Sequence, residues 1–68
     1  MRKNLKNARQ SLCLTQKEVA TFIGLSEKQY ARIERGEADG KVIHWDMLED
    51  WFDISQRVLR ACDLADNL

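Results

Sequence analysis

The sequence predicts an all-α protein that folds as one domain, residues 1–68, built from five short helices. With 68 residues, the chain has room for a single domain and buries only about 60% of the surface that its unfolded form exposes. Its composition, with no proline, three glycines and abundant helix-forming residues, favours helices over other structure. Apolar residues recur every three or four positions, which is the spacing of a helix with one buried face.

The first helix is predicted to begin near Asn4 and to end near Leu12–Cys13. Leu5, Ala8 and Leu12 are three or four residues apart, and polar side chains lie between them. This spacing places the three apolar residues on one face of a short amphipathic helix.

The second helix is predicted between Thr15 and Gly24. Thr15 followed three residues later by Glu18 is a capping box, and a glycine directly after a helix adopts the left-handed conformation readily. The expected buried side consists of Val19, Ala20 and Phe22 or Ile23.

Ser26 is the expected cap of a third helix, which Gly36 ends, and its inward positions are Tyr30 and Ile33/Glu34. So few residues separate Gly24 from Ser26 that the two helices must meet at a tight corner. Residues from about 15 to 36 therefore form a helix-turn-helix pattern.

A fourth helix is predicted after a polar loop, Glu37 to Lys41, and runs to about Phe52. It carries two apolar stripes, one of Val42, Trp45, Leu48 and Phe52 and one of Ile43, Met47 and Trp51. Ser55 is the expected cap of a last helix over residues 56–68, with Ile54, Val58, Ala61, Cys62 and Ala65 available for packing.

Charge is distributed unevenly although the net charge is zero. Residues 1–36 hold eight basic and three acidic side chains, whereas residues 37–68 hold three basic and eight acidic ones. A polyanion is therefore expected to bind the first half of the chain and to be repelled by the second.

Several classes of protein are excluded by the residues present. Cys13, Cys62 and His44 have no spacing typical of a zinc site, so no metal is expected, and the cysteines are expected to be reduced, as in the cytoplasm. No apolar run approaches the ~18 residues of a membrane span. No nucleophile–base set and no phosphate-binding loop is present, so the sequence predicts neither an enzyme nor a cofactor.

With all five helices assigned, residues 5 to about 58 resemble the Cro/CI-type helix-turn-helix family, which includes lambda-like repressors and Xre regulators. The segments that carry the resemblance are LKNARQSLCLTQKEVA, GLSEKQYARIERG and VIHWDMLEDWFDIS. The matching positions are Arg9, Gln16, Val19, Ala20, Gly24, Ser26, Tyr30, Ile33, Glu34 and Gly36. Two positions depart from the pattern: Cys13 stands where the family usually has glycine, and Gly40 where it usually has proline.

The resemblance implies a lambda-repressor-like domain of a cytoplasmic, bacterial or phage-encoded protein that binds double-stranded DNA in the major groove. We expect a transcriptional regulator, a repressor that binds a palindromic operator as a homodimer, of the kind found on mobile elements or prophages. In such domains the second helix of the pair enters the major groove.

Outward positions of the third helix are the expected base contacts. Lys28 and Arg32 share a face and suit guanine, while Glu27 either accepts from cytosine or only stabilises the helix start. The resemblance places Gln16 against a backbone phosphate, and Lys17, Gln29 and Arg35 are candidate phosphate or flanking contacts.

The resemblance also implies that Arg9 and Glu34 form a partly buried ion pair, which joins the first helix to the end of the third. Its role is structural, since removal of one partner would leave the other charge buried and unpaired.

Helices within about 42–66 are candidates for dimerisation. The stripe of Val42, Trp45, Leu48 and Phe52 is expected to close the core, which leaves Ile43, Met47 and Trp51 as the predicted dimer interface. Alternatively, the last helix covers this stripe through Leu59, Cys62 and Leu68. A second functional hypothesis is a protein-interaction module, antitoxin-like or an adaptor, that binds another polypeptide with its acidic, Trp-containing second half.

Overall fold

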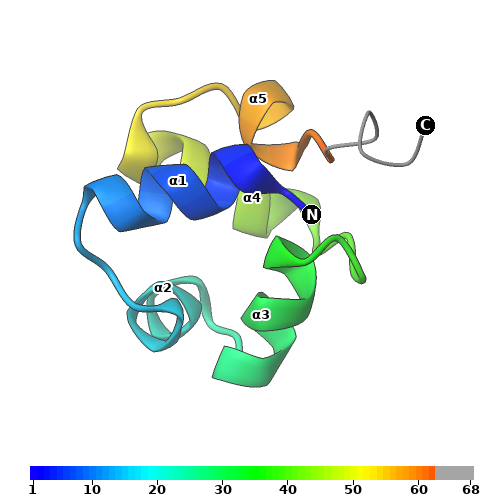
Figure 1. The fold of residues 1–68 in the computed structure, drawn as a ribbon. Helices are drawn as coiled ribbons and strands as arrows, with labels where there is room; N and C mark the ends of the chain where they lie inside the picture. The colour runs from blue at the N-terminus through cyan, green and yellow to red at the C-terminus, as the bar shows by residue number, and fades with distance from the viewer. Residues whose placement is uncertain (63–68) are drawn as a thin grey trace.

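The computed structural model describes residues 1–62 and contains five helices in this range, with no strand (Figure 1). Their bounds are α1, Lys3–Ser11; α2, Gln16–Ile23; α3, Glu27–Glu34; α4, Val42–Phe52; and α5, Gln56–Arg60. In Figure 1, α2 and α3 form the lower half of the molecule, and α1, α4 and α5 form the upper half. The all-α prediction with five helices is confirmed.

Both helices of the central pair begin with a capping box. The Thr15 side chain accepts a hydrogen bond from the Glu18 N–H, and Ser26 accepts one from the Gln29 N–H; each partner side chain accepts from the N–H of the capping residue in return. These bonds satisfy N–H groups that a helix leaves without an internal partner. At the end of α2, Gly24 has a φ of 82°, the left-handed conformation expected from the sequence.

The core lies where the five helices meet. Its buried apolar residues are Leu5, Ala8, Val19, Ala20, Ile23, Tyr30, Ile33, Trp45, Leu48, Phe52 and Leu59. Every helix therefore contributes at least one buried side chain. The helix-turn-helix pair packs in one core with α1 and with α4 and α5 from the second half of the chain.

Five residues assigned to apolar faces are instead exposed: Leu12, Phe22, Val42, Val58 and Ala61. Leu12 follows the last residue of α1, and Val42 occupies the first position of α4, so both lie beyond the part of their helix that faces the core. On α2, Ile23 is buried in the core. Adjacent side chains of a helix point in different directions, so Phe22 faces outward.

The last helix is shorter than predicted and buries a different residue. It ends at Arg60, because Ala61 already has an extended backbone, with a ψ of 127°. Leu59 is its buried residue, while Val58 and Ala61 are exposed. Ala65 and Leu68 lie outside the described residues, so the predicted helix beyond 62 stays a prediction.

The two departures from the family pattern each fall on a residue with positive φ. Cys13 has a φ of 58°, which is the left-handed conformation that glycine adopts at no steric cost. Gly40 has a φ of 72°, which proline cannot adopt, so the loop before α4 follows a path that the usual proline would forbid. A Cβ at Gly40 would also lie 3.2 Å from Ile33 Cδ1.

Candidate nucleic-acid interface

The outer face of α3 carries the predicted base contacts. Tyr30, Ile33 and Glu34 are buried and fix one side of the helix against the core. Residues on the other side are exposed along the length of the helix: Glu27, Lys28, Gln29 and Arg32. The structure therefore leaves all four predicted residues exposed, and the four-residue spacing of Lys28 and Arg32 places these two on one face of the helix.

Three of the predicted contacts on α3 and directly after it already have partners within the chain. The Oε1 atom of Gln29 accepts the Ser26 N–H at 2.9 Å in the capping box, so its amide NH₂ is the group that remains to donate to DNA. Arg35 Nε lies 2.9 Å from Glu37 Oε2, and Arg32 Nε lies 3.8 Å from Glu37 Oε1. These side chains are about half exposed, and exposed pairs of this kind contribute between about 0 and 1 kcal/mol. Either arginine can therefore exchange Glu37 for a DNA phosphate or base at little cost.

Arg9 and Glu34 lie in contact beneath the interface, in two parallel hydrogen bonds. Arg9 Nε donates to Glu34 Oε2 at 2.9 Å, and Arg9 Nη2 donates to Glu34 Oε1 at 3.0 Å. Arg9 Nη1 also donates to the carbonyl of Leu14 at 2.8 Å. The side chains of Arg9 and Glu34 are only 11% and 4% exposed, so this guanidinium joins α1, the corner before α2 and the end of α3.

The environment of this pair shifts three pKa values. Burial opposes ionisation of Glu34 and on its own would raise its pKa. The hydrogen bond and the positive charge of Arg9, with smaller contributions from Tyr30 and Gln16, outweigh burial and keep the pKa of Glu34 below its ordinary value. The hydrogen bond to Glu34 raises the pKa of Arg9 in turn. Burial, and next the negative charge of Glu34, raises the pKa of Tyr30, so its phenol stays neutral. The pair is therefore fully charged at neutral pH.

Gln16, the first residue of α2, is attached to the same pair. Its Nε2 atom donates to Glu34 Oε1 at 3.2 Å, and its side chain is half-buried. Lys17, the next residue, is exposed. The N-terminal end of α2 is thus fixed relative to α3 through one carboxylate, and Lys17 remains at the surface.

Arg2 is a structural residue that the sequence did not reveal, since it counted only as one of the basic residues of the first half. It is 4% exposed, and its guanidinium donates to the carbonyls of Ile33, Ala38 and Arg60. It also contacts Asp39 Oδ1 at 3.3 Å and lies over the ring of Trp45 at 5.3 Å. Arg2 therefore holds the end of α3 and the loop after it, and its charge does not belong to the outer surface.

The predicted dimer stripe is divided by the fold. Ile43 is 63% exposed, whereas Met47 and Trp51 are half-buried and pack against the core. Trp51 is covered in part by Phe22 of α2, whose ring centroid lies 4.2 Å away. The expectation of three exposed apolar residues is therefore right for Ile43 only.

A comparison with known families identifies the central helices. The family model described as helix-turn-helix matches residues 5–39, which is more than half of the chain and covers α1 from its third residue and all of α2 and α3. The chain belongs to the helix-turn-helix family of the Cro/CI, Xre-like type. This is a family of DNA-binding transcription regulators and not a family of enzymes, and the lambda-repressor-like fold expected from the sequence is confirmed.

No curated protein and no solved structure matches this helix-turn-helix protein at the significance required. Within residues 1–62, none of the helices has the length and the apolar character needed to cross a membrane.

Proposed function

We propose that this protein is a sequence-specific regulator of transcription that represses by binding a palindromic operator in double-stranded DNA as a homodimer. The observation that carries the proposal is the outer face of α3. Its exposed polar side chains include Lys28 and Arg32, while Tyr30 and Ile33 anchor the opposite side in the core. A capped, rigidly held helix with a polar outer face fits the major groove, where donors and acceptors differ for every base pair.

Arg32 and Lys28 are the proposed base-reading residues. Arginine can donate two parallel hydrogen bonds to O6 and N7 of guanine, and lysine can donate to the same atoms as a point charge. Glu27 lies in the first turn of α3, where its negative charge interacts favourably with the helix dipole. This stabilisation is present whether or not the carboxylate also accepts a hydrogen bond from a cytosine N4 group.

The N-terminal end of α2 is the proposed phosphate contact. The bond from Gln16 to Glu34 orients the Gln16 amide, and an amide NH₂ has a second hydrogen to donate to a phosphate oxygen. Lys17 beside it, Gln29 on α3 and Arg35 directly after α3 would add sequence-independent contacts to the DNA backbone.

A homodimer follows from the size of the reading element. One eight-residue helix reads few base pairs, whereas two copies related by a two-fold axis place two such helices about 34 Å apart on one side of the duplex. We propose Ile43, with Met47 and Trp51 beside it, as the dimer contact. Ile43 is the most exposed of the three, so the test of the dimer substitutes this residue.

The experiment that tests this function is a binding selection on random duplexes, followed by affinity measurements for variants on the selected site and on random DNA. Arg32→Ala should cost about 1–3 kcal/mol on the selected site and relax preference at one base pair. Lys17→Ala should weaken binding to all sequences alike and lower the salt slope by about one. Arg57→Ala removes an exposed arginine of α5 and serves as the control.

Selection of no sequence, or equal losses for Arg32→Ala on specific and random DNA, would contradict the proposed readout. Sedimentation of the wild type and of Ile43→Glu with the selected duplex tests the homodimer, since two copies per palindrome are expected for the wild type and a weaker second binding step for the variant.

A further inference from the structure

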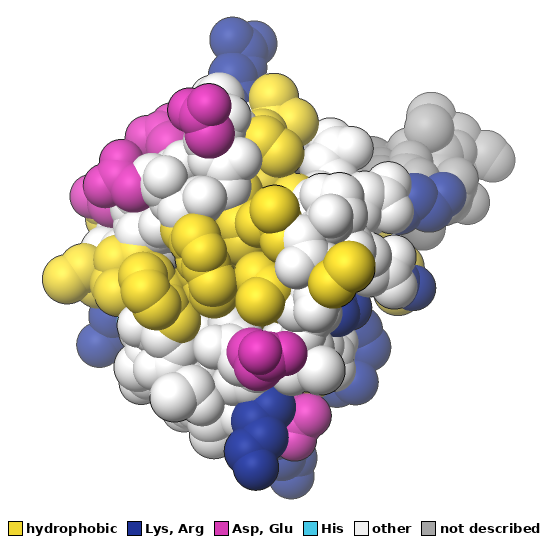
Figure 2. Space-filling view, turned by 90° about the vertical axis from the view of Figure 1, so that its left-hand side faces the viewer, with side chains coloured by type: hydrophobic (Ala, Val, Ile, Leu, Met, Phe, Trp, Pro, Cys, Tyr) yellow, Lys and Arg dark blue, Asp and Glu magenta, His cyan; other side chains and the backbone are white. Residues whose placement is uncertain are grey.

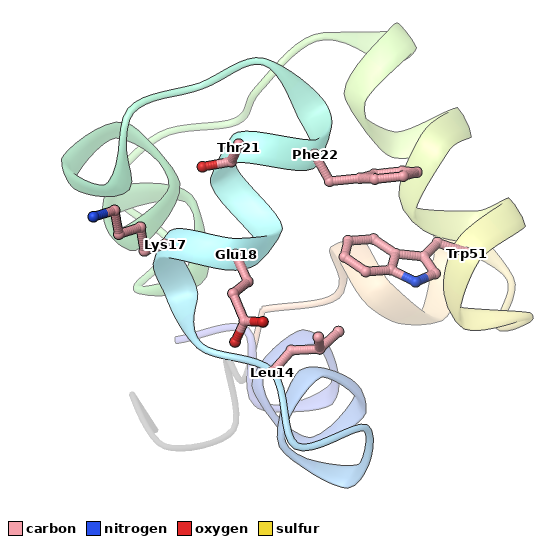
Figure 3. Close-up of a pocket in the computed structure, with 6 residues that line it drawn as sticks. All are labelled: Leu14, Lys17, Glu18, Thr21, Phe22 and Trp51. Atoms are coloured by element: carbon pink, nitrogen blue, oxygen red, sulfur yellow. The ribbon is translucent and has the colours of Figure 1, made fainter.

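A second surface, away from the outer face of α3, lies between α2 and α4. Two adjoining hollows of about 490 and 330 Å³ share Phe22 and Trp51 as a common wall; Leu14 lines the first and Met47 the second. We call the surface formed by Leu14, Phe22, Met47 and Trp51 the aromatic groove. Figure 3 shows the Phe22 ring lying over Trp51, with Leu14 below them; the two rings are tilted by 36°.

The described part of the chain leaves the aromatic groove open. Phe22 is 53% exposed although it is a large aromatic residue. Leu59, which was expected to help cover Trp51, is fully buried in the core instead. In the space-filling view of this side, apolar side chains form a continuous band across the molecule (Figure 2). Contiguous exposed apolar surface of this kind marks an interaction site on a small protein.

The charged residues around the aromatic groove indicate the charge of the partner that it binds. Glu18 lines the first hollow and Asp50 the second. Lys17 is the one basic residue among those that line the two hollows. Acidic side chains gather along one edge of the apolar band in Figure 2. A second copy placed on this surface would bring like charges together, whereas a cationic partner would meet complementary ones.

We propose that the aromatic groove docks a cationic amphipathic helix of another protein. Apolar side chains one turn apart on that helix would enter the two hollows, and Lys or Arg residues beside them would contact Asp50 and Glu18. An arginine of the partner could also stack on the exposed part of the Phe22–Trp51 pair. This interaction goes beyond DNA binding, because the four residues of the groove include none of the proposed DNA contacts, and Lys17 only lines one of its hollows. The groove shares Met47 and Trp51 with the proposed dimer stripe, but Ile43, the centre of the proposed dimer contact, lines neither hollow.

A designed peptide pair tests the proposal without DNA. The probe is a synthetic helix with Leu at every third or fourth position and Lys between, and its partner has Glu in place of every Lys. Trp51 fluorescence reports binding, since the other tryptophan, Trp45, is 1% exposed. The Lys peptide should bind at least about tenfold more tightly than the Glu peptide.

Matched variants locate the binding site. Asp50→Lys should weaken the Lys peptide about three- to tenfold, whereas Glu27→Lys makes the same charge change on α3 and should have a much smaller effect. Phe22→Ser should abolish detectable binding, and Val58→Ser, which truncates an exposed apolar residue of α5, should leave it unchanged. Circular dichroism confirms that each variant is folded, and DNA affinity confirms it for the three variants that lie outside α3.

Three results would overturn the proposal. Equal binding of the two peptides would show unspecific apolar adhesion, and equal losses for Asp50→Lys and Glu27→Lys would show only the diffuse charge of the protein. Self-association that Phe22→Ser abolishes, with no binding of the Lys peptide, would assign the groove to a second copy of the chain.

Discussion

Two arginine–glutamate contacts in this protein have the same Nε–Oε2 distance, 2.9 Å, in opposite surroundings. Arg9 and Glu34 lie between α1 and α3 with side chains 11% and 4% exposed. Arg35 and Glu37 lie at the surface, each about half exposed. Water screens the second pair and competes for its hydrogen bonds, whereas the first is almost entirely enclosed by protein. Burial, and not contact distance, decides what each contact contributes.

The sharpest test of this comparison replaces each carboxylate by its amide. Glu34→Gln should lower the free energy of unfolding by about 3–5 kcal/mol, because it leaves the Arg9 charge buried without a counter-charge. Glu37→Gln should change it by less than about 1 kcal/mol. Urea unfolding of the two variants and the wild type measures the difference. Similar midpoints for the two variants would show that the buried pair stabilises no more than the exposed one.

Arg2 extends the comparison to a buried arginine whose partners are mostly carbonyls. Arg2→Ala should cost about 2–3 kcal/mol, because the carbonyls of Ile33, Ala38 and Arg60 lose a charged donor. Arg57→Ala removes an exposed arginine and should stay within about 0.5 kcal/mol. Thermal melts of both variants provide the measurement. A small loss for Arg2→Ala would mean that water replaces the guanidinium without cost.

Acid should distinguish the two glutamates again. The pKa of Glu34 in the folded protein is below its ordinary value of 4.5, so the folded state gains stability from ionised Glu34 above that pH. This contribution is lost as the pH falls below 4.5 and through the folded pKa. The wild type and Glu37→Gln should therefore lose more stability on acidification than Glu34→Gln does. Parallel stability–pH curves for all three would contradict the shift.

Local signals in the sequence predicted the helix-turn-helix pair well. Thr15–Glu18 and Ser26 specify where helices begin, and Gly24 specifies a corner, because each acts within one turn of chain. The pairing of Arg9 with Glu34 followed only from the family resemblance, since 25 residues separate them.

Features that depend on distant packing were the ones that the sequence did not predict. Arg2 is buried because four separate segments converge around it, and nothing near it in the sequence indicates this. Trp51 and Phe22 lie on different helices, so helical periodicity identified each as apolar without showing that they cover one another. The proposed DNA and dimer contacts remain predictions for the same reason, because they depend on molecules outside the chain.

The smallest expected effect concerns the backbone at the corner between α1 and α2, where Cys13 occupies the left-handed region at a φ of 58°. A residue with a Cβ in this region destabilises the folded state by roughly 1–2 kcal/mol, and glycine avoids this cost. Glycine also has more conformational freedom in the unfolded chain, which offsets about 0.5–1 kcal/mol of the gain. Cys13→Gly should therefore raise the free energy of unfolding by about 0.5–1 kcal/mol. Cys13→Ala is the matched control, because it removes the exposed thiol but keeps the Cβ, and it should leave stability unchanged. Urea unfolding under reducing conditions measures both, and an equal gain for alanine would assign the effect to the thiol instead of the backbone.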